Sequence, residues 1–119
     1  MTQGSVYIAV FYLAQGQYIS VGQLGRLWFQ SGIYFYVGSA QRNWSARLAR
    51  HSRKDKPLRW HIDYLSVRAD MMGAIMVPGK RTRECELAQE LSQIYKLAVP
   101  GFGSSDCRCG GHLFYAVAL

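Results

Sequence analysis

The chain has 119 residues, half of them hydrophobic, and a formal net charge of +7. This length fits one domain with a single core, and the hydrophobic content excludes global disorder. No run approaches the roughly 20 apolar residues that span a bilayer, and the first residues lack the cationic start of a signal peptide. We therefore expect one domain over residues 1–119 in the cytoplasm, with no membrane partner. The three cysteines are expected to be reduced.

The first third of the chain predicts three strands. Residues 6–13 are β-branched and aromatic, and a short loop containing Gly16 separates them from residues 18–21, which predicts a hairpin. Residues 34–38 predict the third strand. Because side chains alternate along a strand, this strand has one apolar face and one face that carries the phenols of Tyr34 and Tyr36.

Helices are expected after this strand and again later in the chain. Asn43 can cap a helix that runs to about Arg53, with Trp44 and Leu48 as its inward pair. Residues 58–65 fit a short helix better than a strand. Thr82 can cap a later helix to about Ala98, whose inward stripe is Leu87, Leu91, Ile94 and Ala98.

Residues 71–77 predict another strand, closed by Pro78 and Gly79. A loop is expected over residues 99–106 and a final strand over residues 113–119. The order of these elements predicts an α+β fold, in which helices pack on a small mixed, largely antiparallel sheet.

The charge is unevenly distributed. Residues 1–54 contain no Asp or Glu, and half of the fourteen Lys and Arg lie between residues 42 and 59, opposed only by Asp55. Such a block attracts polyanions, although a basic helix can also simply be a solvated surface. Arginine outnumbers lysine, and its forked guanidinium suits phosphate. The nucleic-acid-binding candidates are Arg42, Arg50, Arg53 and Lys54.

Four short motifs in order resemble the GIY-YIG nuclease family over roughly residues 4–116. They occupy residues 36–40, 60–65, 84–88 and 101–109. The second signature tripeptide of the family is matched by residues 36–38, and the first is matched by residues 5–7, with Ser5 in place of glycine. Residues 32–34 spell the first signature literally but share a strand with the second, so we do not assign it there. The motifs are most similar to a small stand-alone branch, sometimes joined to base-excision-repair glycosylases.

The resemblance implies a metal-dependent endonuclease with roles for five residues. Tyr7 and Tyr36 would be paired phenols, one of them acting as the base. Arg47 would bind the scissile phosphate, and His51 would assist the phenol. Glu84 would hold one Mg²⁺ or Mn²⁺ ion, with DNA expected rather than RNA and a DNA-repair protein as a candidate partner.

Other interpretations stay open at this point. A nucleic-acid-binding module without turnover would fit the same charge pattern. Glu86 could replace Glu84, but two residues turn a helix by about 200°, so both do not readily serve one ion. His61 with Asp63 is too small a set for a metal site, and a structural or DNA-facing role fits them better. Zinc is not expected, because one residue between two thiols is a poor chelate; the residues considered were Cys85, Cys107, Cys109 and His112.

Overall fold

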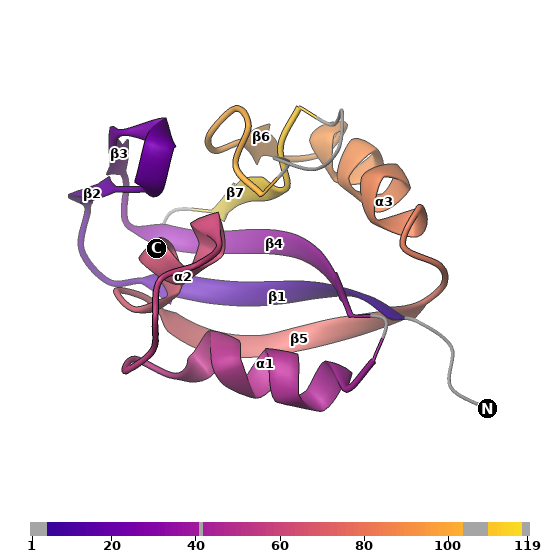
Figure 1. Cartoon of the computed structure of the whole chain (residues 1–119). Coiled ribbons are helices and arrows are strands. Elements are labelled where there is room, and N and C mark those ends of the chain that lie inside the picture. Colours follow the sequence, from indigo (N-terminus) through magenta and orange to yellow (C-terminus); the bar gives the residue numbers. More distant parts are fainter. Residues whose placement is uncertain (1–4, 41, 104–109, 118–119) are drawn as a thin grey trace.

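The computed structural model describes residues 5–40, 42–103 and 110–117, and its centre is a five-stranded sheet (Figure 1). The strand order is β5-β1-β4-β7-β6, and each neighbouring pair is antiparallel. The α+β fold with a largely antiparallel sheet is thus confirmed. The strands are β1 (Ser5–Leu13), β4 (Gly32–Ala40), β5 (Asp70–Pro78), β6 (Lys96–Leu97) and β7 (Leu113–Val117).

Three helices cover the two faces of this sheet (Figure 1). The helices are α1 (Trp44–Ser52), α2 (His61–Ser66) and α3 (Arg83–Ser92). α1 and α2 pack on the face that carries Tyr7 and Tyr36. α3 packs on the opposite face, where its buried side chains join those of Val6 and Val37. The alternation predicted from the sequence is therefore confirmed, and the phenol face is the one enclosed by the two shorter helices.

The predicted hairpin between residues 6–13 and 18–21 is wrong. β2 (Gln17–Ser20) pairs instead with β3 (Arg26–Phe29), a strand that the sequence did not predict, across a turn that contains the short 3-10 helix η1 (Gly22–Leu24). β1 pairs with β4 on one side and β5 on the other. Both edges of β1 are occupied by longer strands, so β2 has no edge to join.

The first helix begins where predicted, but its inward side differs. Asn43 precedes α1 in a left-handed conformation, with φ 51°, and its side chain makes no capping bond. Trp44, predicted to point inward, is 45% exposed, whereas His51 is buried and Leu48 packs against the core. The prediction for Trp44 is therefore wrong: Trp44 and His51 are seven residues apart and share one side of the helix, but only the later turns, with Leu48 and His51, reach the core. The expected helix near residues 58–65 is confirmed as α2.

The later helix is shorter than predicted. Thr82 precedes α3, but the helix ends at Ser92 rather than near Ala98. Ile94, expected in the inward stripe, is 71% exposed, and β6 pairs with β7. Residues Lys96 and Leu97 therefore pair with the edge of β7 and do not continue the helix that the sequence pattern predicts. The strands predicted at residues 71–77 and 113–119 are confirmed as β5 and β7, while residues 104–109 and 118–119 lie outside the described part.

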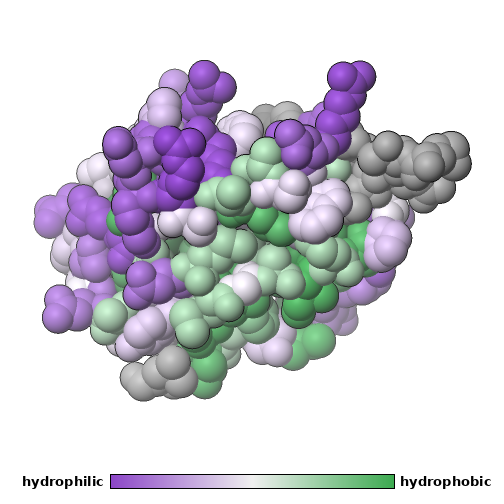
Figure 2. Space-filling view, turned by 90° about the horizontal axis from the view of Figure 1, so that it is seen from below, coloured by the Kyte–Doolittle hydropathy of each residue, from purple (hydrophilic) through white to green (hydrophobic). Residues whose placement is uncertain are grey.

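Seen from below, hydrophobic side chains cover the middle and lower part of the surface, and hydrophilic side chains border them at the left and top (Figure 2). The edge strand β5 separately carries two exposed hydrophobic side chains, those of Met72 and Ile75. No helix among the described residues is long and apolar enough to cross a membrane.

Candidate functional site

A polar pocket of about 540 Å³ lies over the phenol face of the sheet. β1 and β4 form its floor, α1 and α2 contribute one wall, and the start of α3 contributes another. It brings together all five predicted catalytic and metal-binding residues, together with one predicted nucleic-acid contact. These residues are Tyr7, Tyr36, Arg42, Arg47, His51 and Glu84.

The floor of the pocket depends on Gly38. Tyr7 and Gly38 face each other in the β1–β4 register. A Cβ at Gly38 would lie 2.5 Å from the Tyr7 hydroxyl oxygen, so only glycine leaves room for the phenol to cross the neighbouring strand. This gives a physical reason for the last residue of the second signature. Residues 32–34 lie on β4 with that signature, and Tyr34 hydrogen-bonds the Gln30 carbonyl oxygen instead of entering the pocket.

Tyr7 and His51 form a buried hydrogen-bonded pair. The Tyr7 hydroxyl lies 2.7 Å from His51 Nε2, and both side chains are almost fully buried. Burial, aided by the nearby Lys56 ammonium, lowers the pKa of His51 to about 4. Burial also raises the pKa of Tyr7 well above its usual value, although Arg47 opposes this. Near neutral pH, the pair therefore consists of a neutral phenol and a neutral imidazole.

Tyr36 completes the aromatic wall around His51. Its ring centroid lies 5.9 Å from that of His51, in an edge-to-face arrangement. Burial raises the pKa of Tyr36, and the neighbouring Tyr7 acts in the same direction. Tyr36 is therefore also a neutral phenol, and no hydrogen bond joins it to His51.

Arg47 is held in place by two contacts. Its Nη1 donates to the Ser39 carbonyl oxygen at 2.7 Å, and its guanidinium carbon lies 4.6 Å from the ring centroid of Trp60. The guanidinium of Arg50 also lies over the Trp60 ring, at 4.9 Å. Since a hydrogen bond and a cation–π contact restrain it, Arg47 presents a pre-oriented cation beside the phenols.

Glu84 enters the pocket from the first turn of α3. Its Oε2 lies 2.9 Å from Nδ1 of the fully buried His112. Burial raises the pKa of Glu84, but the contacts with His112 and Ser39 outweigh it, so this pKa lies below its usual value. The group is therefore a carboxylate at neutral pH. Among the described residues no three His, Cys, Asp or Glu gather as metal ligands.

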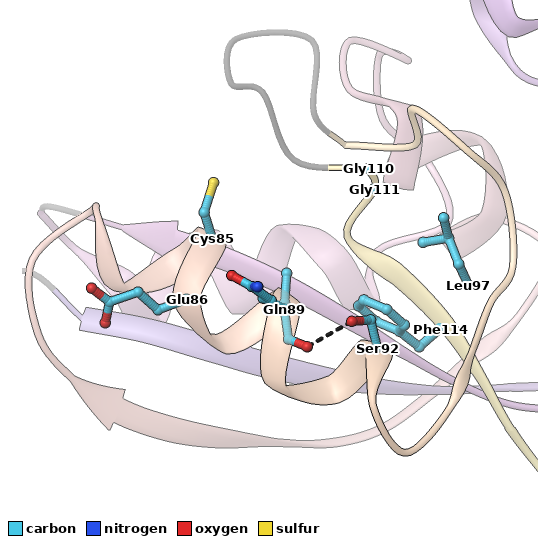
Figure 3. Close-up of a pocket in the computed structure, with 9 residues that line it drawn as sticks. Cys85, Glu86, Gln89, Ser92, Leu97, Gly110, Gly111 and Phe114 are labelled. Carbon is cyan, nitrogen blue, oxygen red and sulfur yellow. Dashed lines mark hydrogen bonds between the residues drawn. The ribbon is translucent and has the colours of Figure 1, made fainter.

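Glu86 lies in a different pocket (Figure 3). That pocket, of about 520 Å³, is formed by α3 and the chain around Gly110, Gly111 and Phe114. Glu86 also contacts Arg83, at 3.4 Å between Oε1 and Nη1. Of the two candidate carboxylates, only Glu84 shares a pocket with Arg47 and the phenols.

The predicted nucleic-acid contacts fall into two groups. Arg42 lines the pocket. The others make contacts within the chain outside it: Arg50 with Asp63, Arg53 with the Asp55 carbonyl oxygen, and Lys54 with the Ser66 and Ala69 carbonyl oxygens. Their role in binding stays a prediction, with Arg50 the most enclosed of the three.

Asp63 organises the wall of the pocket from behind. It is fully buried, and its Oδ2 accepts from Arg50 at 2.8 Å and from the backbone N–H groups of Arg59 and Trp60. Burial raises its pKa, but these donors outweigh it, so the pKa of Asp63 lies below its usual value. His61 instead accepts from the Gly103 N–H at 2.9 Å. The two residues therefore serve separate structural contacts.

Several lining residues were not predicted as part of the site. They are Ser39, Arg59, Trp60, His61, Arg81 and Gly103. Arg59 belonged to the basic block, and all the others except Arg81 belonged to motifs of the resemblance, so five of the six carried a signal. His112 was considered only for zinc, and its contact with Glu84 could not be read from a separation of 28 positions.

The expectation of reduced thiols is wrong for Cys85, which is disulfide-bonded in the structure. The odd number of cysteines and the N-terminal sequence do not indicate which thiols meet in the fold. Cys107 and Cys109 lie outside the described residues.

One of three comparisons with known proteins gave a match. The family model described as "Domain of unknown function DUF123" matches residues 6–118. The chain belongs to this family. DUF123 proteins have a GIY-YIG-like fold, as the paired strands of the two signature tripeptides indicate here. No curated protein and no solved structure matches the chain.

Proposed function

We propose that this DUF123 protein is a metal-dependent endonuclease that hydrolyses phosphodiester bonds of DNA, in repair or nucleic-acid processing. One observation supports it above all others: Arg47, Glu84 and the Tyr7–His51 pair line a single pocket. A phosphate-binding cation, a carboxylate and a proton-transferring pair are the groups that such hydrolysis requires.

Substrate binding follows from the cations of the pocket. Arg42, Arg47, Arg59 and Arg81 line it, against the single carboxylate of Glu84. Guanidinium groups bind phosphate oxygens through charge-assisted hydrogen bonds. Arg47 is the best placed for the scissile phosphate, since it lies beside Tyr7 and is restrained by Ser39 and Trp60.

Proton transfer would use the hydrogen bond between Tyr7 and His51. A neutral His51 has a lone pair on one ring nitrogen, and when this is Nε2 the Tyr7 hydroxyl donates to it. The phenol oxygen can then accept a proton from an attacking water while its own proton moves to His51. Arg47 stabilises the negative charge that develops on the phosphate.

The donor set fits a divalent cation. Glu84 is ionised and lines the pocket, and hard cations such as Mg²⁺ and Mn²⁺ bind through one carboxylate together with phosphate oxygens and waters. Glu84 would hold the ion, which when bound would polarise the phosphate and acidify water. His112 holds the carboxylate in position from the buried side.

A second candidate is a nucleic-acid-binding module without turnover. One observation favours it: the Glu84 carboxylate already has a cationic or hydrogen-bonding partner in His112, which could make a metal ion unnecessary. Salt-sensitive binding without cleavage in any metal would support this alternative.

The deciding experiment measures cleavage of end-labelled single-stranded, duplex and branched DNA, and of RNA, with Mg²⁺, Mn²⁺ or EDTA. The Arg47→Ala and Glu84→Ala variants are expected to lose cleavage by about 10²- to 10³-fold or more, because each removes charge stabilisation at the phosphate. Circular dichroism should show that both remain folded. Full activity in either variant would refute its assigned role, and activity of the wild-type protein in EDTA would refute the metal.

A further inference from the structure

Two aromatic side chains stand on the outer face of the β2–β3 ribbon. Tyr18 and Trp28 are opposite each other in the register, while Ile19 and Phe29 are buried on the inner face. The exposed fractions of Tyr18 and Trp28 are 54% and 55%. Large rings so exposed on neighbouring strands form a patch that water covers at a free-energy cost.

This patch is held in a fixed arrangement. The two ring centroids are 5.0 Å apart with planes at 63°, and the guanidinium carbon of Arg26 lies 4.3 Å from the Tyr18 centroid. A Cβ at Gly16 would lie only 2.8 Å from the Trp28 ring, so that ring packs closely over the backbone of the preceding turn. The rings therefore lose little further freedom when a ligand binds them.

The charges around the patch are positive. Arg26 belongs to it and lies on the same face of the ribbon as Tyr18 and Trp28. The sequence through β2 and β3 contains no Asp or Glu. Lys96 and Trp28 also line one small cavity of about 170 Å³, together with the rings of Tyr34 and Tyr115. Aromatic rings interleaved with cations bind nucleic-acid strands by stacking and by phosphate attraction.

The ribbon is joined to the catalytic pocket through a short chain of aromatic contacts. Phe29 on its inner face lies 6.4 Å from Phe102, and Phe102 lies 6.3 Å from Tyr36, measured between ring centroids. All three rings belong to the same buried cluster on the phenol face of the sheet. The ribbon and the pocket are therefore anchored on the same buried cluster.

We propose that Tyr18, Trp28 and Arg26 form a second nucleic-acid contact, in which unpaired bases of a single-stranded segment stack on the two rings. The proposal rests on the proposed function only in taking nucleic acid as the ligand. It goes further by naming the substrate class: a strand with unpaired bases, since bases paired inside a duplex do not present their faces to such rings. The ligand chemistry is shared by DNA and RNA.

The test measures binding by fluorescence anisotropy with a labelled 20-nucleotide single strand, the same sequence as RNA, and a blunt duplex. EDTA is present throughout, so that no cleavage occurs. The Tyr18→Ala/Trp28→Ala variant should bind the DNA or RNA strand at least about tenfold more weakly, since each stacked base contributes on the order of a tenfold effect. Its affinity for the blunt duplex should change less than twofold.

Two controls separate stacking from general damage. Met72→Ala/Ile75→Ala removes side chains of similar exposure, 63% and 55%, from β5 and should leave single-strand binding unchanged. Tyr18→Phe/Trp28→Phe keeps an aromatic ring at both positions and should restore most of the affinity. If the alanine variant does not fold, a protein with Trp28 as its only tryptophan (Trp44→Phe/Trp60→Phe) gives a second measurement: single strands should quench its emission and blunt duplex should not.

Equal losses for single strand and duplex, or no loss for either, would overturn the proposal. A shift from dimer to monomer in the alanine variant, with unchanged single-strand binding, would instead identify the patch as a contact between copies of the chain and would also overturn it. Absence of cleavage by the wild-type protein with metal would count against the proposed function alone, because the binding measurement needs no turnover.

Discussion

Two pockets of nearly equal volume, about 540 and 520 Å³, lie on either side of the first turn of α3. The first contains phenols, imidazoles, guanidiniums and the Glu84 carboxylate. The second contains Glu86 with small and apolar side chains such as those of Leu97 and Phe114 (Figure 3). Volume therefore does not show which pocket is the better candidate for an active site. The number of titratable side chains that line each pocket does.

The difference follows from helix geometry. Glu84 and Glu86 are two residues apart, which turns their side chains by about 200° around the helix axis. One faces His112 and the phenols, and the other faces Arg83 on the outer side. Two glutamates that are almost adjacent in sequence thus lie in different environments. Substitutions can test whether the proposed reaction depends on only one of the two pockets.

The largest effect in this set is expected for Tyr7→Phe. The variant keeps the ring over Gly38 but removes the hydroxyl that lies 2.7 Å from His51 Nε2. Loss of general acid–base transfer lowers rates by about 10²- to 10⁴-fold, and single-turnover cleavage with Mg²⁺ measures it. Tyr34→Phe is the matched control, since its hydroxyl binds the Gln30 carbonyl oxygen away from the pocket. Equal effects of the two changes would remove Tyr7 from the chemistry.

Asp63→Asn is expected to lower the free energy of unfolding by about 3–5 kcal/mol, because it leaves the Arg50 and Lys56 cations without their buried partner. The lowered pKa of Asp63 has a second consequence. Its stabilisation is complete above the unfolded-state pKa, near 3.8, and is lost as pH falls through the folded-state value. Urea unfolding of both proteins at pH 7 and pH 3 checks this: the difference should shrink in acid, and a difference that grows would contradict it.

The pH dependence of cleavage should reflect the lowered pKa of His51. With the pKa of His51 near 4, its imidazole stays neutral far below the ordinary value of 6.5, so its protonation should not reduce the rate between pH 7 and pH 5. NMR titration of the His51 ring locates this pKa independently. A midpoint near 6.5 would show that burial does not act on this ring as described.

The lowered pKa of His51 also affects folding stability. Between pH 4 and pH 6.5 the unfolded chain binds a proton at His51 that the folded protein does not, so the free energy of unfolding should rise as pH increases from about 4 to 6.5.

The smallest effect is expected for Glu86→Gln. This side chain lines the second pocket and contacts Arg83 at the exposed surface, where an ion pair contributes little. Cleavage and the free energy of unfolding should both stay close to those of the wild type. A loss as large as that in the Glu84 variant would mean that the second pocket takes part in the reaction.

The sequence predicted what depends on local periodicity. The two faces of β1 and β4 follow from alternation, and the two tyrosines, Arg47, His51 and Glu84 were identified through the resemblance and lie in one pocket. The errors arise where tertiary pairing decides. The edge of β7 captures Lys96 and Leu97 from the predicted helix, and the occupied edges of β1 leave β2 to pair with β3.

The contacts that hold the site residues in position could not be predicted from the sequence either. His112 reaches Glu84 because its backbone extends the sheet beside β4, where its carbonyl oxygen accepts from the Val37 N–H at 2.9 Å. Asp63 gathers donors from α1 and from the segment before α2. Such contacts join residues far apart in sequence, so no periodicity indicates them.

The most direct test of the proposed active site is a crystal of the protein soaked with Mn²⁺ and measured at the manganese absorption edge. One anomalous peak is expected within coordination distance of the Glu84 carboxylate, in the pocket that Tyr7 and Arg47 line. A peak at Glu86 instead, or none at Glu84 at a saturating concentration of the ion, would contradict a metal-dependent site in this pocket.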